Sequence, residues 1–419
     1  MDDQSRAAES LRREVASRFG VPAGSVRVVR APYRVCPLGA HVDHQLGPAT
    51  AMALDRGVLL AYAPSPSREV RLESLDFPGL VAFLLDDVPP RRPDDWGNFP
   101  RGAALALHAR HRLERGILGV TAGKLHGGGV SSSAAIGVAF LLAFEDVNRL
   151  RVSVEENIGL DRRVENDYLG LRNGILDPAA ILVSRRGHLT AIDCRTSAHE
   201  LIPPAPGMPP FRILLAFSGL RRELVRTDYN RRVAECAEAA RTLLASIGRD
   251  DGEPVLGDVA PDAYDAHKGR LRDAPARRAA HFFSEADRVR RGVAAWRRGD
   301  LAGFGALMTA SGESSIRNYE CGSPPLVDLY QALAEAEGVH GARFSGAGFR
   351  GCCVALVEPG AVDSVADRVA AAYAGRHPDL ARRAPIVVCD TGDGAEIVDH
   401  PHDGAAPLGL NLRPVSRLP

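Results

Sequence analysis

Three short segments of the chain carry residue types and spacings that could do chemistry. The first begins at Gly127 and reads GGGVSSSAA. Glycines let a backbone approach a ligand closely, and a helix that begins at the serines offers unpaired N–H groups and partial positive charge to a phosphate. The serine hydroxyls could also bind Mg²⁺. Taken alone, such a segment is more often a plain glycine-rich turn with a serine helix cap.

The second segment starts at Arg34 and reads RVCPLGAHVDH. Its arginine follows a predicted strand, and the polar side chains behind it can hydrogen-bond a polyol. The spacing of His41, Asp43 and His44 also resembles part of a metal site, but three ligands within four residues do not easily converge on one ion. A loop with satisfied histidines is the alternative interpretation.

The third segment spans residues 344–353 and reads FSGAGFRGCC between two predicted strands. Its glycines can adopt positive φ, which tight hairpins require. By itself this segment predicts only a hairpin.

Composition narrows the class of protein. Equal numbers of basic and acidic residues, 52 each, and an aromatic share of 5% disfavour nucleic-acid binding. The apolar stretch 134–144 is far shorter than the ~20 residues that span a bilayer, and the N-terminus has no apolar signal region. The seven cysteines form no CxxC pair, which argues against a disulfide framework and a zinc site. We therefore expect a cytoplasmic protein without membrane or nucleic-acid partners.

Lysine is nearly absent from the chain. Lys124 and Lys268 are the only two, so the phosphate-binding pattern GxxxxGK[ST] cannot occur. If the protein binds phosphates, it must use backbone amides, helix ends, arginine and metal.

The elements that must position these segments follow from hydrophobic periodicity and turn residues. In the N-terminal half we predict helix 5–18, strands 26–30, 49–63 and 70–75, a proline-rich loop over 86–98, and helices 99–113, 131–148 and 153–170. Residues 70–75 are expected to be the antiparallel neighbour of 49–63. The last of these helices starts with the capping box that Ser153 and Glu156 form.

A cluster of prolines over 203–210 marks the expected domain boundary, because proline interrupts both helices and strands. This gives a domain over 1–202, a second over 211–398 and a flexible tail over 399–419. In the second domain we predict strands 211–217, 341–346, 352–357 and 385–389, a helical region 230–314 and helix 361–374. That order is β-α-β-β-α-β, the split βαβ arrangement, and the fold class is α+β.

Taken together, the three segments resemble the GHMP kinases. The order AP-R-GxHxDH, GGGxSSSAA and GAGFxGC matches that family over about residues 26–390, and in detail it looks like the galactokinases. Within the family the chain is most similar to galacturonokinases, through PYRVCPLGAHVDHQ, YLGLRNGILD, RILLAFSGLR and GARFSGAGFRGCC. The resemblance implies two domains: one with a mixed sheet, and a ferredoxin-like C-terminal domain with inserted helices.

The activity that the resemblance implies is ATP-dependent phosphorylation of the anomeric hydroxyl of D-galacturonate, with Mg²⁺, to give galacturonate 1-phosphate. The alternatives are a galactokinase or another sugar 1-kinase that acts on galactose or glucuronate, and a non-catalytic sugar sensor. A metal-dependent hydrolase that uses the two histidines and the aspartate of the second segment is the remaining alternative. The implied partners are a small sugar acid and ATP, and the protein is expected to be a monomer or homodimer.

The resemblance also assigns residues to the reaction. Asp177 matches the catalytic base and Arg34 its cationic partner, although Asp177 before Pro178 also suits a helix N-cap. Ser132 or Ser133, with Glu165, matches the Mg²⁺ ligands; a solvated helix carboxylate is the alternative for Glu165. The residues expected around the ATP phosphates are Gly127, Gly128, Gly129, Val130, Ser131, Ser132, Ser133 and Ala134.

The residues expected around the sugar are Ala40, His41, Asp43, Gly174, Tyr229, Gly346 and Gly348. Ala40 stands where galactokinases carry a glutamate beside C6. A uronic acid has a carboxylate at C6, and a second carboxylate nearby would repel it by several kcal/mol in a poorly solvated pocket. The candidate partners for the substrate's carboxylate are Arg172, Arg221 and Arg226, and Arg350 could touch phosphate, sugar acid or only its own hairpin.

Overall fold

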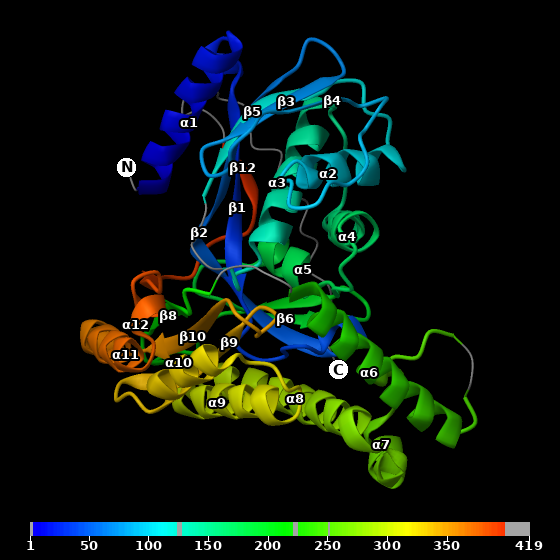
Figure 1. The fold of residues 1–419 in the computed structure, drawn as a ribbon, viewed down its shortest axis with the longest axis vertical. Coiled ribbons are helices and arrows are strands. Elements are labelled where there is room, and N and C mark those ends of the chain that lie inside the picture. The colour runs from blue at the N-terminus through cyan, green and yellow to red at the C-terminus, as the bar shows by residue number, and fades with distance from the viewer. Residues whose placement is uncertain (1–2, 124–127, 221–224, 250–251, 399–419) are drawn as a thin grey trace.

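The computed structural model describes residues 3–123, 128–220, 225–249 and 252–398. Two sheets, each with its own helices, are stacked along the long axis of the molecule (Figure 1). The predicted tail over 399–419 lies outside the described residues.

Within the described residues the first sheet has eight strands in the order β12-β1-β2-β5-β3-β4, with β6 on β2 and β7 on β6. The strands are β1 Arg27–Val35, β2 Pro48–Pro64, β3 Glu69–Ser74, β4 Val81–Leu84, β5 Ile117–Ala122, β6 Leu189–Asp193, β7 His199–Ile202 and β12 Glu396–Val398. The expectation that residues 70–75 pair antiparallel with 49–63 is wrong. β5 takes that place beside β2, and β3 runs parallel to β5.

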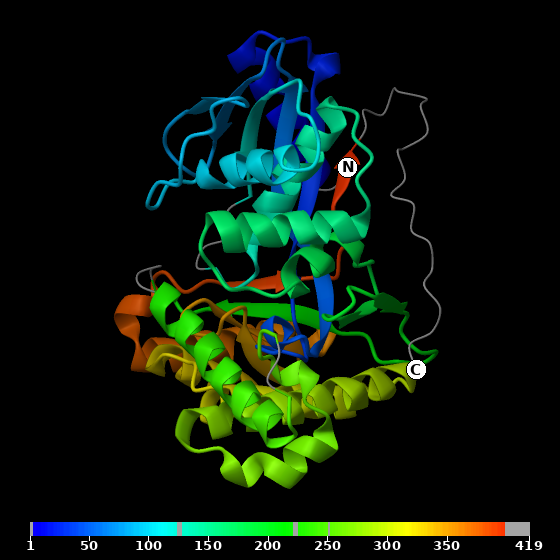
Figure 2. The same cartoon turned by 90° about the vertical axis from the view of Figure 1, so that its right-hand side faces the viewer.

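Helices cover both faces of this sheet (Figure 2). α1 packs Leu11 and Val15 on one face, against Val28 and its neighbours. The other face is covered by α2 Asn98–His108, α3 Ser132–Val147, α4 Val154–Arg163 and α5 Leu176–Val183, while α1 spans Asp3–Phe19. The helix predicted over 99–113 therefore ends five residues early. α3 is apolar nearly all round and buried, which holds the glycine-rich segment before it in place.

The second sheet has the order β11-β8-β10-β9, and all its neighbouring strands are antiparallel. Its strands are β8 Arg212–Phe217, β9 Val339–Ser345, β10 Cys352–Val357 and β11 Ile386–Cys389. The described helices of this part are α6 Val225–Ser246, α7 Pro261–His267, α8 Asp273–Arg297, α9 Leu301–Arg317, α10 Pro324–Ala334, α11 Val362–Arg376 and α12 Pro378–Ala381. This is the predicted split βαβ arrangement with helices inserted after its first strand.

Two chain segments connect the part with the first sheet to the part with the second sheet, one before β8 and one after β11. The chain passes from β7 to β8 across the proline cluster, and β12 then returns to pair with β1 in the first sheet. Figure 1 shows this late strand beside the early one. The predicted domain limits stay a prediction, but the strand at 396–398, which they assign to the second domain, belongs to the first sheet.

No helix in the described ranges combines the length and apolar character that crossing a membrane requires.

Candidate active site

Arg34 and Asp177 form an ion pair between β1 and α5, in which the arginine is buried and the aspartate is partly exposed. A bulge in β1 between Pro32 and Arg34 shifts the register at this point. The Nε and Nη2 atoms of Arg34 each lie 2.7 Å from Oδ1 of Asp177, and the arginine side chain is only 4% exposed. Burial strengthens this pairing because little water competes for either charge. The two residues assigned to the reaction are thus in direct contact.

Asp177 is not a helix cap. α5 begins at Leu176, so Asp177 lies inside the first turn, and Ile175 takes the N-cap position without a side-chain cap. The carboxylate instead accepts a hydrogen bond from Ser131 Oγ through Oδ2. The N-cap interpretation is therefore wrong, because the aspartate side chain is directed to Arg34 and Ser131.

The phosphate loop, which we define as residues 128–134, leads into the N-terminus of α3. Gly128 and Gly129 have φ of 76° and 94°, and Ser131, directly before the helix, has φ of 56°. The backbone N–H of Arg34 donates to Val130 O over 3.2 Å, which ties the loop to β1. Gly127, the first residue of the predicted motif, lies outside the described residues.

The third segment packs directly on the phosphate loop. Ser345 Oγ donates to Gly129 O over 2.6 Å. A Cβ at Gly346 would lie 2.9 Å from Gly129 Cα, so the two backbones approach so closely that glycine is required. The β9–β10 hairpin is therefore both a hairpin, as its own pattern predicts, and a wall of the candidate site.

Glu165 is a buried carboxylate that contacts the first turn of α3. It accepts hydrogen bonds from Ser133 Oγ and Asn173 Nδ2, both at 2.8 Å. The residue lies in a π-helical turn, Val164–Tyr168, that continues α4, and such turns are frequent at functional sites. Burial, and then the charge of Asp177, raise the pKa of Glu165 to about 7. The alternative interpretation of Glu165 as a solvated helix carboxylate is wrong, because the residue is 1% exposed.

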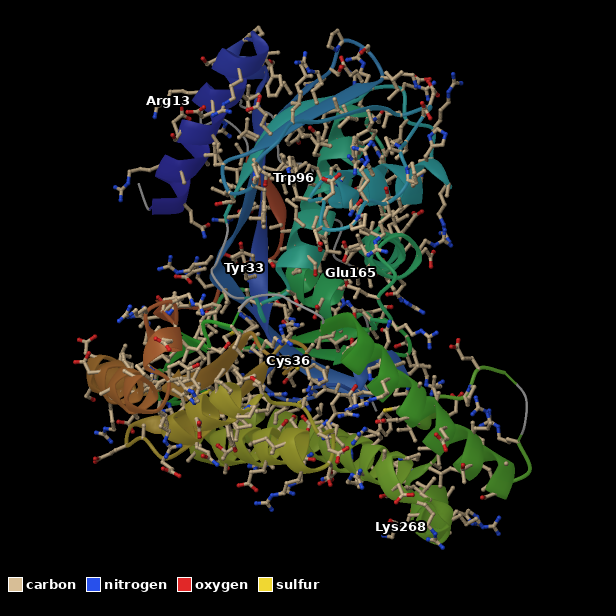
Figure 3. All side chains as sticks on the ribbon, viewed as in Figure 1. Arg13, Tyr33, Cys36, Trp96, Glu165 and Lys268 are labelled. Carbon is tan, nitrogen blue, oxygen red and sulfur yellow. The ribbon has the colours of Figure 1, made fainter. Side chains whose placement is uncertain are left out.

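These oxygen donors fit Mg²⁺. A buried carboxylate beside serine hydroxyls is a hard-oxygen set, which is what Mg²⁺ prefers. Ser133 contacts Glu165 directly, and Ser132 is its neighbour at the first position of α3. Figure 3 labels Glu165 among the helices that lie across from Tyr33 of β1 and from Cys36, the residue after this strand. Asn173, which sequence reasoning did not single out, holds the other oxygen of Glu165.

The sugar loop, which we define as residues 39–43, follows β1. Asp43 accepts backbone hydrogen bonds from His44 and Leu176, and burial together with Asp177 raises its pKa to about 6. A Cβ at Gly174 would lie 2.6 Å from Asp43 Oδ2, so glycine is needed for this approach. The fold thus brings Asp43 and Gly174 beside the Arg34–Asp177 pair.

The histidines of the second segment do not converge on a metal. His41 stacks on Tyr319 with ring centroids 4.2 Å apart, and His44 Nε2 lies 3.2 Å from Tyr319 Oη. Within the described ranges there is no group of three or more histidine, cysteine, aspartate or glutamate side chains that could hold a metal ion. The metal-dependent hydrolase therefore finds no support there.

The remaining sugar residues lie around the same loop. The ring of Tyr229, from α6, is edge-on to His44 with centroids 6.0 Å apart. A Cβ at Gly348 would lie 3.4 Å from His41 Nε2, so the third segment also touches the sugar loop. Ala40 is buried. Each of these residues is thus near the loop, although they come from distant parts of the chain.

The structure describes the side chains of two of the four candidate arginines. Arg172 is exposed, and Arg350 is half-buried with its carbonyl accepting a hydrogen bond from Ser218 Oγ. Arg221 and the side chain of Arg226 lie outside the described residues.

Two residues near the site carry no recognisable sequence signal. His281 and Glu285 of α8 contact the backbone of Gly39 and Ala40 from about 240 positions away in the sequence. No local motif marks them, since their pattern is that of any helix with a buried face.

Comparison with known proteins agrees with this architecture. Residues 98–185 match the GHMP kinases N terminal domain, residues 293–375 match the GHMP kinases C terminal domain, and residues 16–64 match the galactokinase galactose-binding signature. The chain is 47% identical to the galacturonokinase of Arabidopsis thaliana, covering 93% of this chain and 97% of the relative. It is 34% identical to the galactokinase of Roseiflexus sp. (strain RS-1), covering 88% and 92% respectively.

A solved structure shows the same fold. The galactokinase of Lactococcus lactis, complexed with galactose, superposes with a TM-score of 0.86 at 28% identity, covering 93% of this chain and 99% of that one. The matched domains and the identity over nearly the whole length establish the relationship. The chain therefore belongs to the GHMP kinase family, among its galactokinase-like members.

Proposed function

We propose that this sugar 1-kinase transfers the γ-phosphoryl group of ATP to the anomeric hydroxyl of D-galacturonate, giving galacturonate 1-phosphate. The observation that carries the proposal is the contact of Asp177 with Arg34 of β1 and with Ser131 of the phosphate loop, beside Asp43 of the sugar loop. A carboxylate at that point can reach a sugar hydroxyl on one side and a phosphate on the other. The higher identity to a galacturonokinase than to the galactokinases supports the choice of sugar.

Asp177 would accept the proton of the anomeric hydroxyl. Its Oδ1 receives two N–H groups of Arg34, whereas Oδ2 receives Ser131 Oγ from the part of the chain that the structure describes. A carboxylate oxygen offers about two acceptor sites, so free capacity remains at Oδ2. In the proposed reaction Oδ2 therefore takes the proton, while Arg34 fixes the orientation of the carboxylate and offsets the developing negative charge.

The phosphate loop would hold ATP at the start of α3. Phosphoryl transfer depends mostly on positioning and charge stabilisation. The N-terminal N–H groups of α3 and the loop backbone supply fixed positive ends of dipoles. We assign Gly128, Gly129 and residues 130–134 to this role, together with Gly127.

Glu165 and Ser133 would hold Mg²⁺, with Ser132 beside them. Burial and the charge of Asp177 raise the pKa of Glu165, and a bound cation would offset both effects. A bound Mg²⁺ would neutralise part of the negative charge of the ATP phosphates. Asn173 keeps the glutamate oriented toward the loop.

Ala40, His41, Asp43, Gly174, Tyr229, Gly346 and Gly348 would surround the sugar. The small apolar side chain of Ala40 leaves room for a carboxylate at C6 and adds no negative charge. Asp43 and His41 would instead bind sugar hydroxyl groups. This distribution of charge supports a uronic acid as the substrate.

Galactose is the second candidate, because residues 16–64 match a galactose-binding signature. The deciding experiment is a kinase assay with Mg-ATP on D-galacturonate, D-glucuronate, D-galactose and D-glucose, with ³¹P NMR to locate the phosphate. We expect kcat/KM for galacturonate at least tenfold above that for galactose. A preference for galactose would replace the proposed substrate with the second candidate.

A further inference from the structure

Two buried side chains of α8, His281 and Glu285, form hydrogen bonds with the backbone at the start of the sugar loop. Glu285 Oε1 accepts the backbone N–H groups of Gly39, at 2.8 Å, and Ala40, at 3.3 Å. His281, one helical turn earlier, donates from Nε2 to Ala40 O at 3.0 Å. Because residues four apart lie on one face of a helix, a single face of α8 binds both peptide groups that flank Ala40.

The backbone at this point has the shape of an anion-binding nest. Gly39 has φ of 95°, and its N–H and that of Ala40 point to the same oxygen. A Cβ at Gly39 would overlap the backbone of Ala49, so the conformation depends on glycine. The protein's own carboxylate fills this nest, and these two N–H groups are therefore not available to the substrate's carboxylate.

Glu285 is itself fixed from three elements. Arg288 Nε lies 2.6 Å from Oε2, Ser311 Oγ of α9 donates to Oε1 at 2.6 Å, and Arg343 Nη1 of β9 lies 3.9 Å from Oε1. Burial opposes the charged form, but His281, Arg288 and Arg343 outweigh it and lower the pKa of Glu285 to about 2. The carboxylate therefore stays ionised, and its place is set by the part of the molecule that carries the second sheet.

We propose that Glu285 is a positioning residue for the sugar, acting through the backbone of Gly39 and Ala40. By fixing the two successive peptide groups before Ala40, it sets the direction of the Ala40 methyl group. His281, which binds the carbonyl of Ala40, continues this control toward His41. The proposal rests on the proposed function of the sugar loop. It assigns to α8 a part in substrate binding although α8 supplies no side chain to the sugar itself.

The test is the Glu285→Gln variant, which keeps the shape but removes the charge and half of the acceptor capacity. Hydrogen bonds to a charged group are the stronger ones, so the loop should lose its fixed orientation. We expect KM for the sugar to rise at least tenfold and KM for ATP to change less than threefold. A purely structural role predicts otherwise: fewer active molecules lower the apparent kcat and leave both KM values unchanged.

Asp287→Asn is the matched control, because Asp287 lies on the exposed side of the same helix and pairs with Arg290 and Arg291. It should leave both KM values unchanged.

If Glu285→Gln gives no folded protein, Ser311→Ala removes one donor to the same oxygen and should raise sugar KM two- to fivefold. An unchanged sugar KM in whichever of these variants folds contradicts the proposal.

Calorimetric titration with D-galacturonate and D-galactose separates this proposal from the function it rests on. A wild-type protein that binds a sugar but transfers no phosphoryl group contradicts the proposed function alone. A Glu285→Gln protein that binds the sugar as tightly as the wild type contradicts the positioning role alone. A wild-type protein that binds neither sugar contradicts both.

Discussion

Glu165 and Glu285 are nearly fully buried glutamates at opposite ends of the candidate site, and their pKa values move in opposite directions. Glu165, at the phosphate end, has two neutral donors and a nearby carboxylate, and its pKa rises to about 7. Glu285, at the sugar end, has two arginines, a hydroxyl and two peptide N–H groups, and its pKa falls to about 2.

The difference between the two ends lies in the partners of each carboxylate. A buried carboxylate with its full set of donors and cations fixes the backbone around it. One that lacks a cation is held at an electrostatic cost that a ligand can relieve. We therefore associate the sugar end with a preformed shape, and the phosphate end with a charge that a metal ion completes.

The largest effect should come from Asp177→Asn. The amide keeps the size of the side chain but removes the proton acceptor, and a positioned base accounts for ~10²–10⁴ in rate. We expect kcat to fall by that factor while the affinities for ATP and sugar, measured by calorimetry, change little. Turnover within a factor of three of the wild type would leave Asp177 without a catalytic role.

Glu165→Gln should have the next largest effect. Removing one group that stabilises developing charge lowers kcat by roughly 10²-fold, and the Mg²⁺ concentration for half-maximal rate should rise. Steady-state kinetics across a Mg²⁺ series measures both quantities.

The pH dependence of Mg²⁺ binding sharpens the same prediction. The charged form of Glu165 is the one that binds metal, so protons compete with Mg²⁺ as the pH falls through about 7. The wild type should therefore need more Mg²⁺ at pH 6 than at pH 8, and Glu165→Gln should show a smaller difference. An identical pH dependence in the two proteins would exclude Glu165 as the titrating ligand.

Ala40→Glu tests the sugar end. A new carboxylate beside C6 should lower kcat/KM for galacturonate at least tenfold, about 1.4 kcal/mol, whereas use of galactose holds or improves. Higher salt should reduce the effect if it reaches the charge. A folding defect would lower both activities together, and an unchanged ratio would mean that Ala40 does not face C6.

The smallest effect concerns a buried carboxylate away from both ends. Glu145 of α3 accepts a hydrogen bond from Asn157 Nδ2 at 3.1 Å, and burial raises its pKa to about 8. The folded state therefore holds a proton that the unfolded state releases above its ordinary pKa of 4.5. The contribution of Glu145 to the free energy of unfolding is fully present below pH 4.5, and it is lost as the pH rises through about 8.

Glu145→Gln should remove this pH dependence, because glutamine cannot ionise. Thermal unfolding at pH 6 and pH 9 should show a Tm advantage of the variant that grows by a few degrees toward pH 9. Glu155→Gln, on the exposed surface of α4, is the control and should leave the Tm difference as in the wild type. The same Tm profile for Glu145→Gln and the wild type would contradict the prediction.

Much of the fold could be predicted from local sequence. The helices at 5–18 and 131–148 and the four strands of the second sheet lie within a few residues of their predicted bounds. These elements have strong periodicity or clear turn residues at their ends. The partner of residues 70–75 could not be predicted, because strand pairing depends on where β5, some forty residues later, enters the sheet.

The candidate site also has some residues that the sequence predicts and some contacts that only the structure shows. Arg34 and the glycines belong to local motifs of the sequence, and the resemblance to the GHMP kinases assigned Asp177 and Glu165 to the site. Only the tertiary structure decided that Asp177 does not cap α5, and that Ser133 and Asn173 hold Glu165. It also brought His281 and Glu285 to the sugar loop. A side chain's partner is set by which elements pack together, and that packing depends on contacts between residues far apart in the chain.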